Sequence, residues 1–475
     1  MHRNDALTLA QSALDSGRLF ADLRRRVALR TESDGGTVPP ALAAYLTDEL
    51  RPSLEALGFD CRLCPNPDPK GGPFLIARRI EDPTLPTLLS YGHGDVVSGQ
   101  DAQWREGLAP WTLVAEGERW YGRGTSDNKG QHSIALAALE AVLQARGGRL
   151  GFNMTWLFET GEEAASPGLA AVCEAERAAL AADLFIASDG PRVGTRQPTL
   201  FLGSRGAVNF TLRIRSGRTR GYHSGNWGGV LANPATRIAH AVGTLADAHG
   251  RLLVEALRPP PVDEAVRRAL ADIPIGAEPD DPALDAGWGE PGLTPAERLV
   301  AWNTFEVLAL EAGHPQRPIN AIPHQAAAHC QLRFVVGTDW ERTAEHVQAH
   351  LAAHGFDDVE VQVTLAGAAT RLDLRNPWVD WAVGSITRSA GHAPHLLPNL
   401  AGSLPNDIFA TQLGLPTLWV PHGHAGCAQH APNEHILVPL VRQGLAVMAG
   451  LYWDLGEHDA APWSDGLYAQ CSDPQ

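Results

Sequence analysis

The chain has 475 residues, more than one hydrophobic core usually serves, so two domains are expected. Hydrophobic residues make up 44% and charged residues 19%, a balance that argues against a disordered or fibrous protein. The formal net charge of −16 argues against a nucleic-acid or anionic-membrane partner, because such partners need a basic surface.

The sequence also predicts a soluble protein of the cytoplasm. The first twenty or so residues predict an amphipathic helix and hold no apolar run long enough for a signal peptide. No stretch approaches the roughly 18 apolar residues that a membrane span needs. Six cysteines in a chain of this length do not form a disulfide scaffold, and the C-x-x-C pair Cys61 and Cys64 lacks partners for a zinc site. A reducing compartment fits these thiols best.

Helical and strand patterns alternate through residues 1–204. Such alternation predicts a mainly parallel sheet with helices on both faces. The expected helices cover 5–30, 40–57, 130–146 and 167–181, and the expected strands cover 74–78, 87–97, 153–158 and 183–188.

The pattern changes after residue 204. Residues 206–215, 326–336 and 358–366 alternate in the manner of half-buried antiparallel strands, and helices are expected from 234 and over 340–354. The stretch 258–296 is rich in Pro, Gly and Asp and predicts an irregular excursion. A buried parallel-type strand then returns over 416–423. We therefore predict an α/β catalytic domain, 1–204 and 371–475, interrupted by an inserted α+β domain over 205–370.

Polar residues follow several of the predicted parallel strands. His93 and Asp95 come after one strand, Glu162 and Glu163 after a second, and Asp189 after a third. In such sheets ligands bind beyond the carboxyl ends of the strands. Each cluster alone has an ordinary explanation as a satisfied polar residue or a solvated face. Together they predict a site at this edge.

The residue types in these clusters suit hydrolytic metal ions. Catalytic zinc takes imidazole and carboxylate ligands and keeps a position open for water. A pair of metals about 3.5–4 Å apart needs a bridging group, usually a carboxylate. Further candidates lie in G-T-S-D-N-K-G, which contains Asp127, and in H-A-P-N-E, which begins at His430.

The ordered motifs resemble those of one known family. They read H-x-D, then G-R-G-x-x-D-x-K-G, then E-E, then D-G, then H-x-x-N-E, and they span nearly the whole chain. The chain thus resembles the metallopeptidases and deacylases that include aminoacylase, acetylornithine deacetylase, succinyl-diaminopimelate desuccinylase, glutamate carboxypeptidase and carnosine-type dipeptidases. The resemblance implies two zinc ions, with cobalt or manganese as alternatives.

The resemblance assigns the metal ligands residue by residue. His93 and Asp189 would complete the first site, Glu163 and His430 the second, and Asp127 would bridge both. Asp95 would fix the ring of His93. The family pattern also implies a cis peptide between Asp127 and the next residue.

The catalytic roles follow in the same way. Glu162 would be the general base that takes a proton from water and delivers it to the leaving amine. In the alternative, Glu162 is the metal ligand and Glu163 supports it from beside the site. His223, in G-Y-H-S-G, resembles the histidine that reaches the partner's active site in dimeric relatives and stabilises the oxyanion. The alternative for His223 is a turn residue.

Substrate-binding residues are also implied by the resemblance. Arg333, in Q-L-R-F, would pair with a substrate carboxylate, although a surface charge on a strand is the alternative. The segment 401–407 resembles the family's G-G-S-I-P loop, so Gly402 and Ser403 would line the pocket. Asn320 would also contact substrate.

This chain departs from the family pattern in the loops. Ser98 replaces a proline, Ala165 replaces the glycine of E-E-x-G-S, and Ala401 replaces the first glycine of G-G-S-I-P. None of these changes removes a ligand or the base. Since the loops shape the pocket, the departures leave the substrate open.

We therefore predict a cytoplasmic dinuclear metallohydrolase that cuts an amide or peptide bond next to a free carboxylate, in the manner of a dipeptidase or carboxypeptidase. An N-acyl-amino-acid deacylase is the alternative, and a non-catalytic metal-binding homologue is a third hypothesis. The long insertion resembles those of carnosinase-like dipeptidases. Its substrate would be a small peptide or N-acyl amino acid, and the inserted lid domain would form a homodimer.

Overall fold

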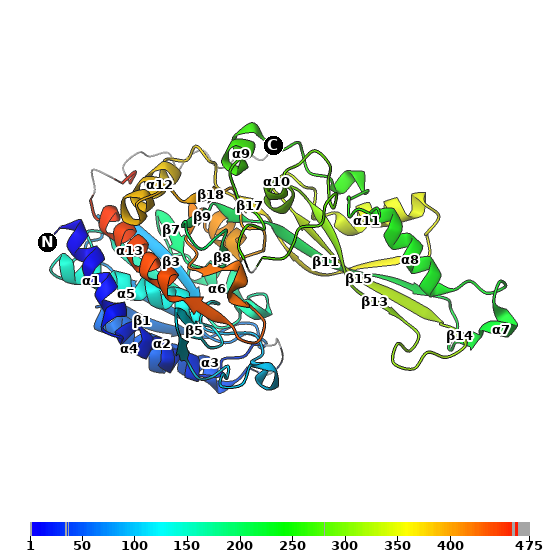
Figure 1. The fold of residues 1–475 in the computed structure, drawn as a ribbon, viewed down its shortest axis with the longest axis horizontal. Helices are drawn as coiled ribbons and strands as arrows, with labels where there is room; N and C mark the ends of the chain where they lie inside the picture. The colour runs from blue at the N-terminus through cyan, green and yellow to red at the C-terminus, as the bar shows by residue number, and fades with distance from the viewer. Residues whose placement is uncertain (1, 34–35, 37, 280, 458–460, 464–475) are drawn as a thin grey trace.

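The computed structural model describes residues 2–33, 36, 38–279, 281–457 and 461–463. A large α/β body contains both ends of the described chain, and an elongated unit extends from it (Figure 1). We call this extension the distal unit and define it as residues 206–254 and 304–367.

The body is built around one eight-stranded sheet. Its order is β1-β2-β6-β3-β7-β19-β9-β18. The neighbours β6–β3, β3–β7 and β7–β19 are parallel, whereas β1, β2 and β6 pair antiparallel at one side. The predicted α/β class with a mainly parallel sheet is thus confirmed. The strands are β1 (Asp60–Cys64), β2 (Phe74–Arg79), β3 (Thr87–His93), β6 (Asn153–Glu159), β7 (Leu184–Ala187), β9 (Thr199–Phe201), β18 (His395–Leu397) and β19 (Thr417–Trp419).

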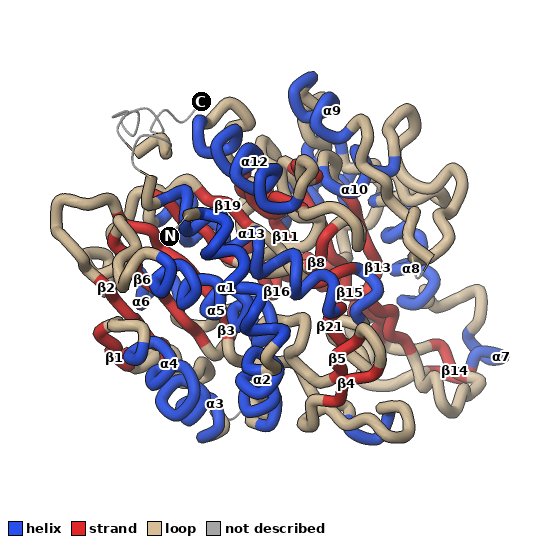
Figure 2. Tube along the Cα trace, turned by 60° about the vertical axis from the view of Figure 1, so that its left-hand side comes forward, coloured by secondary structure: helices blue, strands red, loops and turns tan. Residues whose placement is uncertain are grey.

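Both faces of this sheet are covered. Along β6, Trp156 and Phe158 belong to one buried cluster and Leu157 to another, because successive side chains point to opposite faces. One cluster includes α1 (Arg3–Asp15), α2 (Arg18–Ala28), α5 (Lys129–Ala145), α12 (Pro377–Ala390) and α13 (Val438–Leu455). The other includes α6 (Leu169–Ala175), α9 (Glu264–Leu270) and α10 (Pro295–Val300). In Figure 2, α1 and α13 lie side by side across the strands.

The N-terminal helices are shorter than predicted. The expected helix over 5–30 is divided between α1 and α2 by Gly17, whose φ of 76° leaves the helical region. The expected helix over 40–57 consists of α3 (Pro40–Ala44), a wider turn and α4 (Arg51–Ala56). Pro52 lies at the start of α4 and cannot donate a backbone hydrogen bond to the preceding turn, which explains the interruption.

The distal unit contains a four-stranded antiparallel sheet of order β13-β15-β11-β16. These strands are β11 (Gly206–Arg215), β13 (Thr304–Ala312), β15 (Gln325–Phe334) and β16 (Glu360–Gly367). Helices α8 (Pro234–Leu245) and α11 (Thr343–Ala353) pack on one face and enclose a separate core. Large apolar side chains on β13 and β16 are exposed: Val307, Leu308, Leu310, Val363 and Leu365.

Two helices in the excursion after residue 258, α9 and α10, contribute to the core of the body. Val266 and Val300 share a buried cluster with Phe409 and Trp419, which line the main sheet. The sequence places this stretch inside the predicted insertion 205–370, so the insertion includes a segment that packs back on the main sheet. The side chain of Asn303, which is buried, donates to the carbonyl of Leu257 at 2.8 Å where the excursion ends.

Short paired strands complete the body and the junction. They are β4 (Val114–Glu116) and β5 (Arg119–Tyr121) with β21 (His435–Leu437), β8 (Pro191–Arg192) with β20 (Gly423–His424), and β10 (Gly203–Ser204) with β17 (Thr370–Arg371). Cys61 and Cys64 lie on β1 as free thiols, and their odd spacing turns them to opposite faces. No helix among the described residues is long and apolar enough to cross a membrane.

Candidate metal centre

The predicted metal-binding residues come from loops at one edge of the main sheet. His93 is the last residue of β3, residues 162–163 follow β6, and Asp189 follows β7. Since β6, β3 and β7 are parallel neighbours, their carboxyl ends meet at this edge. Asp127 lies just before α5, and His430 lies in the loop before β21. The fold therefore brings distant segments of sequence to one place.

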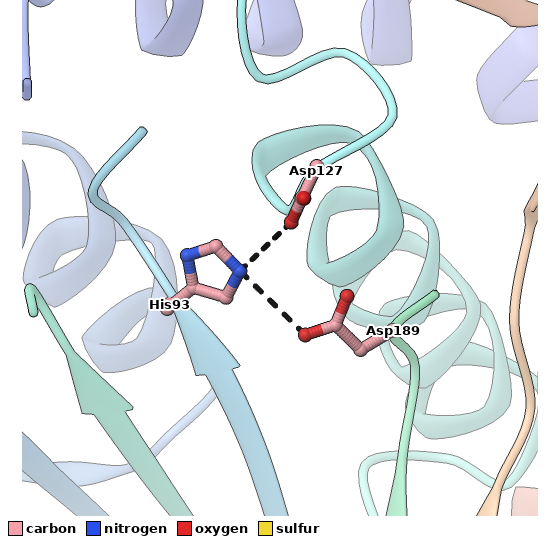
Figure 3. A group of neighbouring side chains, drawn as sticks. All are labelled: His93, Asp127 and Asp189. Carbon is pink, nitrogen blue, oxygen red and sulfur yellow. Dashed lines mark hydrogen bonds and ion pairs between the residues drawn. The ribbon is translucent and has the colours of Figure 1, made fainter. Parts of the chain in front are cut away.

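A first group of ligands consists of His93, Asp127 and Asp189. The Nε2 atom of His93 lies 3.0 Å from Oδ1 of Asp127 and 3.5 Å from Oδ2 of Asp189 (Figure 3). All three side chains are buried. Their ligand atoms converge closely enough to hold one metal ion.

A second group consists of Asp127, Glu163 and His430. The Nε2 atom of His430 lies 3.0 Å from Oδ2 of Asp127 and 3.1 Å from Oε2 of Glu163. Asp127 thus directs one carboxylate oxygen to each histidine, which is the arrangement that a bridging ligand requires. The His430 side chain is 54% exposed, so this side of the centre is open.

Asp95 supports both the first histidine and the two glutamates. Its Oδ1 lies 3.4 Å from Nδ1 of His93. Its carboxylate also accepts the backbone N–H of Glu162 at 3.2 Å and that of Glu163 at 3.0 Å. Asp95 therefore orients the ring of His93, whose Nδ1 also lies 3.1 Å from the backbone carbonyl of Asp95, and its carboxylate fixes the turn that carries the glutamates.

The electrostatics of the centre reflect crowded carboxylates. Burial and repulsion from Asp127 raise the pKa of Glu163 to about 7. Burial, together with Asp189 and Glu163, also raises the pKa of Glu162 well above its ordinary value. Hydrogen bonds to Asp127 and Glu163 raise the pKa of His430 to about 10. The acidic groups thus draw protons or cations into the centre.

Divalent metal ions fit these residues. The ligand atoms within each group all lie within 4.8 Å of one another. Each group offers one imidazole and two carboxylates, a donor set used by catalytic zinc that also accepts cobalt or manganese. A cation would relieve the repulsion that raises the carboxyl pKa values. The two groups share Asp127, so they can hold two ions beside each other.

Glu434 holds the loop that carries Asp127, a role that the sequence analysis missed. It is 1% exposed, and its Oε1 accepts the backbone N–H of Ser126 at 2.8 Å and of Asp127 at 3.1 Å. Its Oε2 accepts from the backbone N–H of Gly124 at 3.0 Å and from Arg123 at 2.9 Å. The pairing of G-R-G with H-x-x-N-E in the motif set is the sequence signal for this contact.

A second buried network holds the other side of Asp127. The predicted cis peptide between Asp127 and Asn128 is present. The Asn128 amide donates to the carbonyl of Ser188 at 2.8 Å, so its oxygen faces Nδ1 of His132 at 3.0 Å and accepts a hydrogen bond from that N–H. Nε2 of His132 then accepts a hydrogen bond from the hydroxyl of Tyr45 at 2.7 Å. The network joins the residues next to two predicted ligands.

The substrate side of the centre is a cavity of about 420 Å³. Glu162 and His430, which belong to the metal centre, line it together with Arg333, Gly402 and Ser403. Nη1 of Arg333 donates to Oγ of Ser403 at 2.9 Å. The structure thus joins the predicted base and the predicted carboxylate-binding residues in one cavity.

Gln429 also lines this cavity and was absent from the sequence prediction. Its amide donates to Oδ2 of Asp127, the oxygen that His430 also contacts. Its position directly before His430 is the available sequence signal. An amide donor next to the bridging carboxylate adds a polar group to the metal side of the cavity.

His223 and Asn320 lie elsewhere, at the far tip of the distal unit. His223 ends β12 (Tyr222–His223), which pairs with β14 (Ala321–Ile322) and leads into α7 (Ser224–Trp227). Figure 1 shows α7 and β14 at the end of the molecule furthest from the body. The His223 side chain is exposed, and its Nδ1 accepts the N–H of Gly225 at 3.1 Å, so Nε2 carries the proton of the neutral ring. Neither residue meets the metal centre of its own chain in this structure.

A centre with two histidines and three carboxylates, buried around His93 and open at His430, lies next to a cavity that holds a further glutamate, and this combination defines a metal-dependent hydrolase. The chain belongs to the family described as Peptidase family M20/M25/M40, whose model matches residues 89–454. The predicted family resemblance is thereby confirmed, and with it an enzyme that hydrolyses amide or peptide bonds.

Named relatives agree with this membership. The chain is 28% identical over 368 residues to a cysteinylglycine-S-conjugate dipeptidase of Corynebacterium striatum, a match that covers 74% of this chain and 76% of that protein. It is 31% identical over 250 residues to the Beta-Ala-His dipeptidase of Mus musculus, covering 50% of this chain and 49% of that protein.

Two solved structures share the fold. The dipeptidase Dug1p of Saccharomyces cerevisiae superposes with a TM-score of 0.78 at 23% identity, covering 96% of this chain and 99% of that chain. Human carnosine dipeptidase 1 superposes with a TM-score of 0.79 at 21% identity, covering 95% of this chain and 99% of that chain. The fold similarity therefore includes the distal unit as well as the body.

Proposed function

We propose that this protein is a dipeptidase that hydrolyses the peptide bond of a small peptide with a free C-terminal carboxylate. One observation carries the proposal: a single cavity joins Glu162 and His430 to Arg333 and Ser403. A guanidinium fork next to a hydroxyl suits a carboxylate, and the metal side suits the adjacent carbonyl. The names of the relatives, which act on dipeptides, support the same substrate class.

Two divalent ions, zinc in the first instance, are part of the proposal. His93, Asp127 and Asp189 would hold one, and Asp127, Glu163 and His430 the other. When bound, such ions polarise a scissile carbonyl and make water acidic enough to supply a nucleophile near neutral pH.

Glu162 acts as the general base and acid. It lines the cavity, whereas Glu163 turns to His430 and belongs to the second ligand group, which supports this division of roles over the reverse. Burial and neighbouring carboxylates raise the pKa of Glu162. A raised pKa lets the carboxylate accept a proton from water and return it to the leaving amine.

A second copy of the chain completes the site. His223 carries its proton on Nε2, as an oxyanion donor requires, but it lies at the far tip of its own distal unit. The exposed apolar side chains of β13 and β16, including Leu308 at 58% and Leu310 at 57%, offer a surface for a partner. We assign the homodimer to this unit, with His223 and Asn320 serving the partner's cavity.

An N-acyl-amino-acid deacylase remains the second candidate, because Arg333 and Ser403 would bind the carboxylate of such a substrate equally well. We place the enzyme in the cytoplasm, an assignment supported by the free thiols of the described cysteines.

The deciding experiment is a hydrolysis screen with the zinc-loaded protein. L-alanylglycine, L-cysteinylglycine and β-alanyl-L-histidine are compared with N-acetyl-L-alanine and N-acetyl-L-methionine. We expect dipeptides to be cleaved with a kcat/KM at least tenfold above that of either acylated amino acid, a difference of about 1.4 kcal/mol in transition-state binding. Preference for the acylated amino acids would replace the proposal with the deacylase.

A further inference from the structure

Arg205 occupies the junction between the body and the distal unit. It lies between β10 and β11, where the chain leaves the main sheet. The residue is only 6% exposed. Its Nε donates to the carbonyl of Ala401 at 2.7 Å, and its Nη1 donates to the carbonyl of Trp302 at 3.3 Å and to Oγ1 of Thr304 at 3.5 Å. A buried guanidinium thus joins three segments through neutral oxygens.

The backbone of Arg205 holds the same loop from its other side. The N–H of Arg205 donates to the carbonyl of Leu400 at 3.0 Å. The carbonyl of Arg205 accepts the hydroxyl of Ser403 at 2.8 Å. Residues 400–403 are therefore bound to this one residue through main chain and side chain together. Ser403 in turn receives the guanidinium of Arg333 at 2.9 Å.

The charge of Arg205 is poorly compensated. A buried cation is costly unless an anion lies nearby. Burial and the neighbouring charge of Arg333 lower the pKa of Arg205, and the carboxylate that opposes this, Glu306, is exposed to solvent. Two guanidinium groups thus stand beside the loop that lines the cavity. An anionic substrate group would supply the missing negative charge.

We infer that Arg205 is a positioning residue of the carboxylate-binding subsite, which holds residues 400–403 so that Ser403 stays within reach of Arg333 and which adds a second positive charge behind that loop. Arg205 does not line the cavity itself, so it acts through Ser403 and Arg333. The inference rests on the proposed function, because it assigns a role in binding the substrate carboxylate.

The test compares a substrate that carries the carboxylate with one that lacks it. The zinc-loaded wild type and Arg205→Met are assayed with L-alanylglycine and with L-alanylglycinamide. For the free acid we expect KM to rise about 10–100-fold with kcat changed less than about threefold, the size of effect of one hydrogen-bonded charge. For the amide we expect little change, so the preference for the acid over the amide collapses.

Two further variants separate positioning from general damage. Arg205→Lys keeps the charge and loses the fork, so it should recover part of the preference. Arg79→Met is the control for general damage, because Arg79 donates to the backbone carbonyls of Leu57 and Gly148 at the opposite end of the strands, although it also pairs with Glu81. It should lower the melting temperature and leave the preference unchanged. Equal losses on acid and amide in Arg205→Met would overturn the inference.

Binding without turnover distinguishes this inference from the proposed function. L-alanylglycine and L-alanylglycinamide are titrated calorimetrically into zinc-loaded Glu162→Gln, with and without Arg205→Met. If the wild type cleaves neither compound, the proposed function fails, and a loss of acid-selective binding in the double variant still supports the inference. Binding of the acid that is unchanged by Arg205→Met, or absent from both proteins, overturns it.

Discussion

The metal centre and the tip of the distal unit contain residues with opposite environments. His93, Asp127 and Asp189 are buried among fixed hydrogen-bond partners such as Asp95 and Glu434. At the tip, the side chain of His223 is exposed and that of the neighbouring Trp227 is 43% exposed. The metal centre is therefore organised by this chain alone, whereas the tip is suited to contact with the surface of a second protein chain.

The largest effect on kcat is expected for a mutation at the metal centre. Glu162→Gln should lower kcat by about 10²- to 10⁴-fold, because the amide cannot accept a proton from water. Metal content, measured by elemental analysis after dialysis, should equal that of the wild type, since neither ligand group includes Glu162. A variant that loses one metal instead would reverse the assignments of Glu162 and Glu163.

The tip of the distal unit should be nearly as important for turnover as the metal centre. His223→Ala should lower kcat by roughly 10²- to 10³-fold, the size of effect for an oxyanion donor, without loss of metal. His240→Ala, an exposed histidine on α8, is the matched control and should leave kcat unchanged. Mixing His223→Ala with Glu162→Gln should restore activity if each chain serves its partner. An active monomer in size-exclusion chromatography, or no recovery on mixing, would contradict the shared site.

Mutation of the residues that hold the metal-binding loops should change the affinity for metal. Glu434→Gln should weaken zinc binding by about 10–100-fold, because the hydrogen bonds that hold the loop of Asp127 are lost or reversed. Competition with a chromophoric chelator measures this directly. Zinc affinity equal to that of the wild type would show that Asp127 is held without Glu434.

Asp454→Asn provides the control for a buried carboxylate away from the centre. Although burial opposes the shift, hydrogen bonds from Arg3, Ser385 and Arg388 hold the pKa of Asp454 below its ordinary value. A lowered pKa contributes stability above the unfolded value of about 3.9, and the contribution is lost as pH falls through the folded value. The variant should therefore lose stability at pH 7, converge with the wild type at acid pH, and keep its zinc affinity.

The smallest effect concerns a strained turn beside the base. Ala165 has a φ of 68° and a ψ of 38°, a left-handed conformation that favours glycine. Ala165→Gly should raise the free energy of unfolding by about 0.5–1 kcal/mol, after the entropy cost of glycine is included. Ala164→Gly, in the preceding helical turn, should lower it by a similar amount. Denaturant unfolding measures both, and shifts of the same sign would contradict the strain.

The sequence predicts the metal centre better than the tip of the distal unit. The candidate residues follow parallel strands, and the ends of such strands must meet, so the strand pattern brings His93, the pair 162–163 and Asp189 together, whereas the family resemblance assigned each ligand. Glu434 was visible in its motif, yet besides Arg123 its partners are the backbone N–H groups of Gly124, Ser126 and Asp127, so its role depends on the folded loop. The long stretch after 258 looked irregular because short helices such as α9 are stabilised by packing on the main sheet more than by their own sequence.

The position of His223 could not be predicted from its motif. Its residue type suits an oxyanion donor, but its distance from the cavity depends on how the distal unit extends, which is a property of the whole fold (Figure 1). The prediction of one continuous helix over 5–30 was wrong for a local reason. Gly17 has a left-handed conformation that interrupts an otherwise continuous amphipathic pattern.

Because the excursion packs on the main sheet, limited proteolysis and the construction of chimaeras are both constrained in this protein. The chain passes between body and distal unit near Arg205, Leu257, Asn303 and Thr370, and the amide of Asn303 binds Leu257 and Thr338 across these passages. A protease that cleaves once within 271–294 would therefore leave two fragments that stay associated, because each fragment contributes segments to both the body and the distal unit. Neither unit can be exchanged with a homologue as one uninterrupted gene segment, so chimaeras should be joined at all of these passages together.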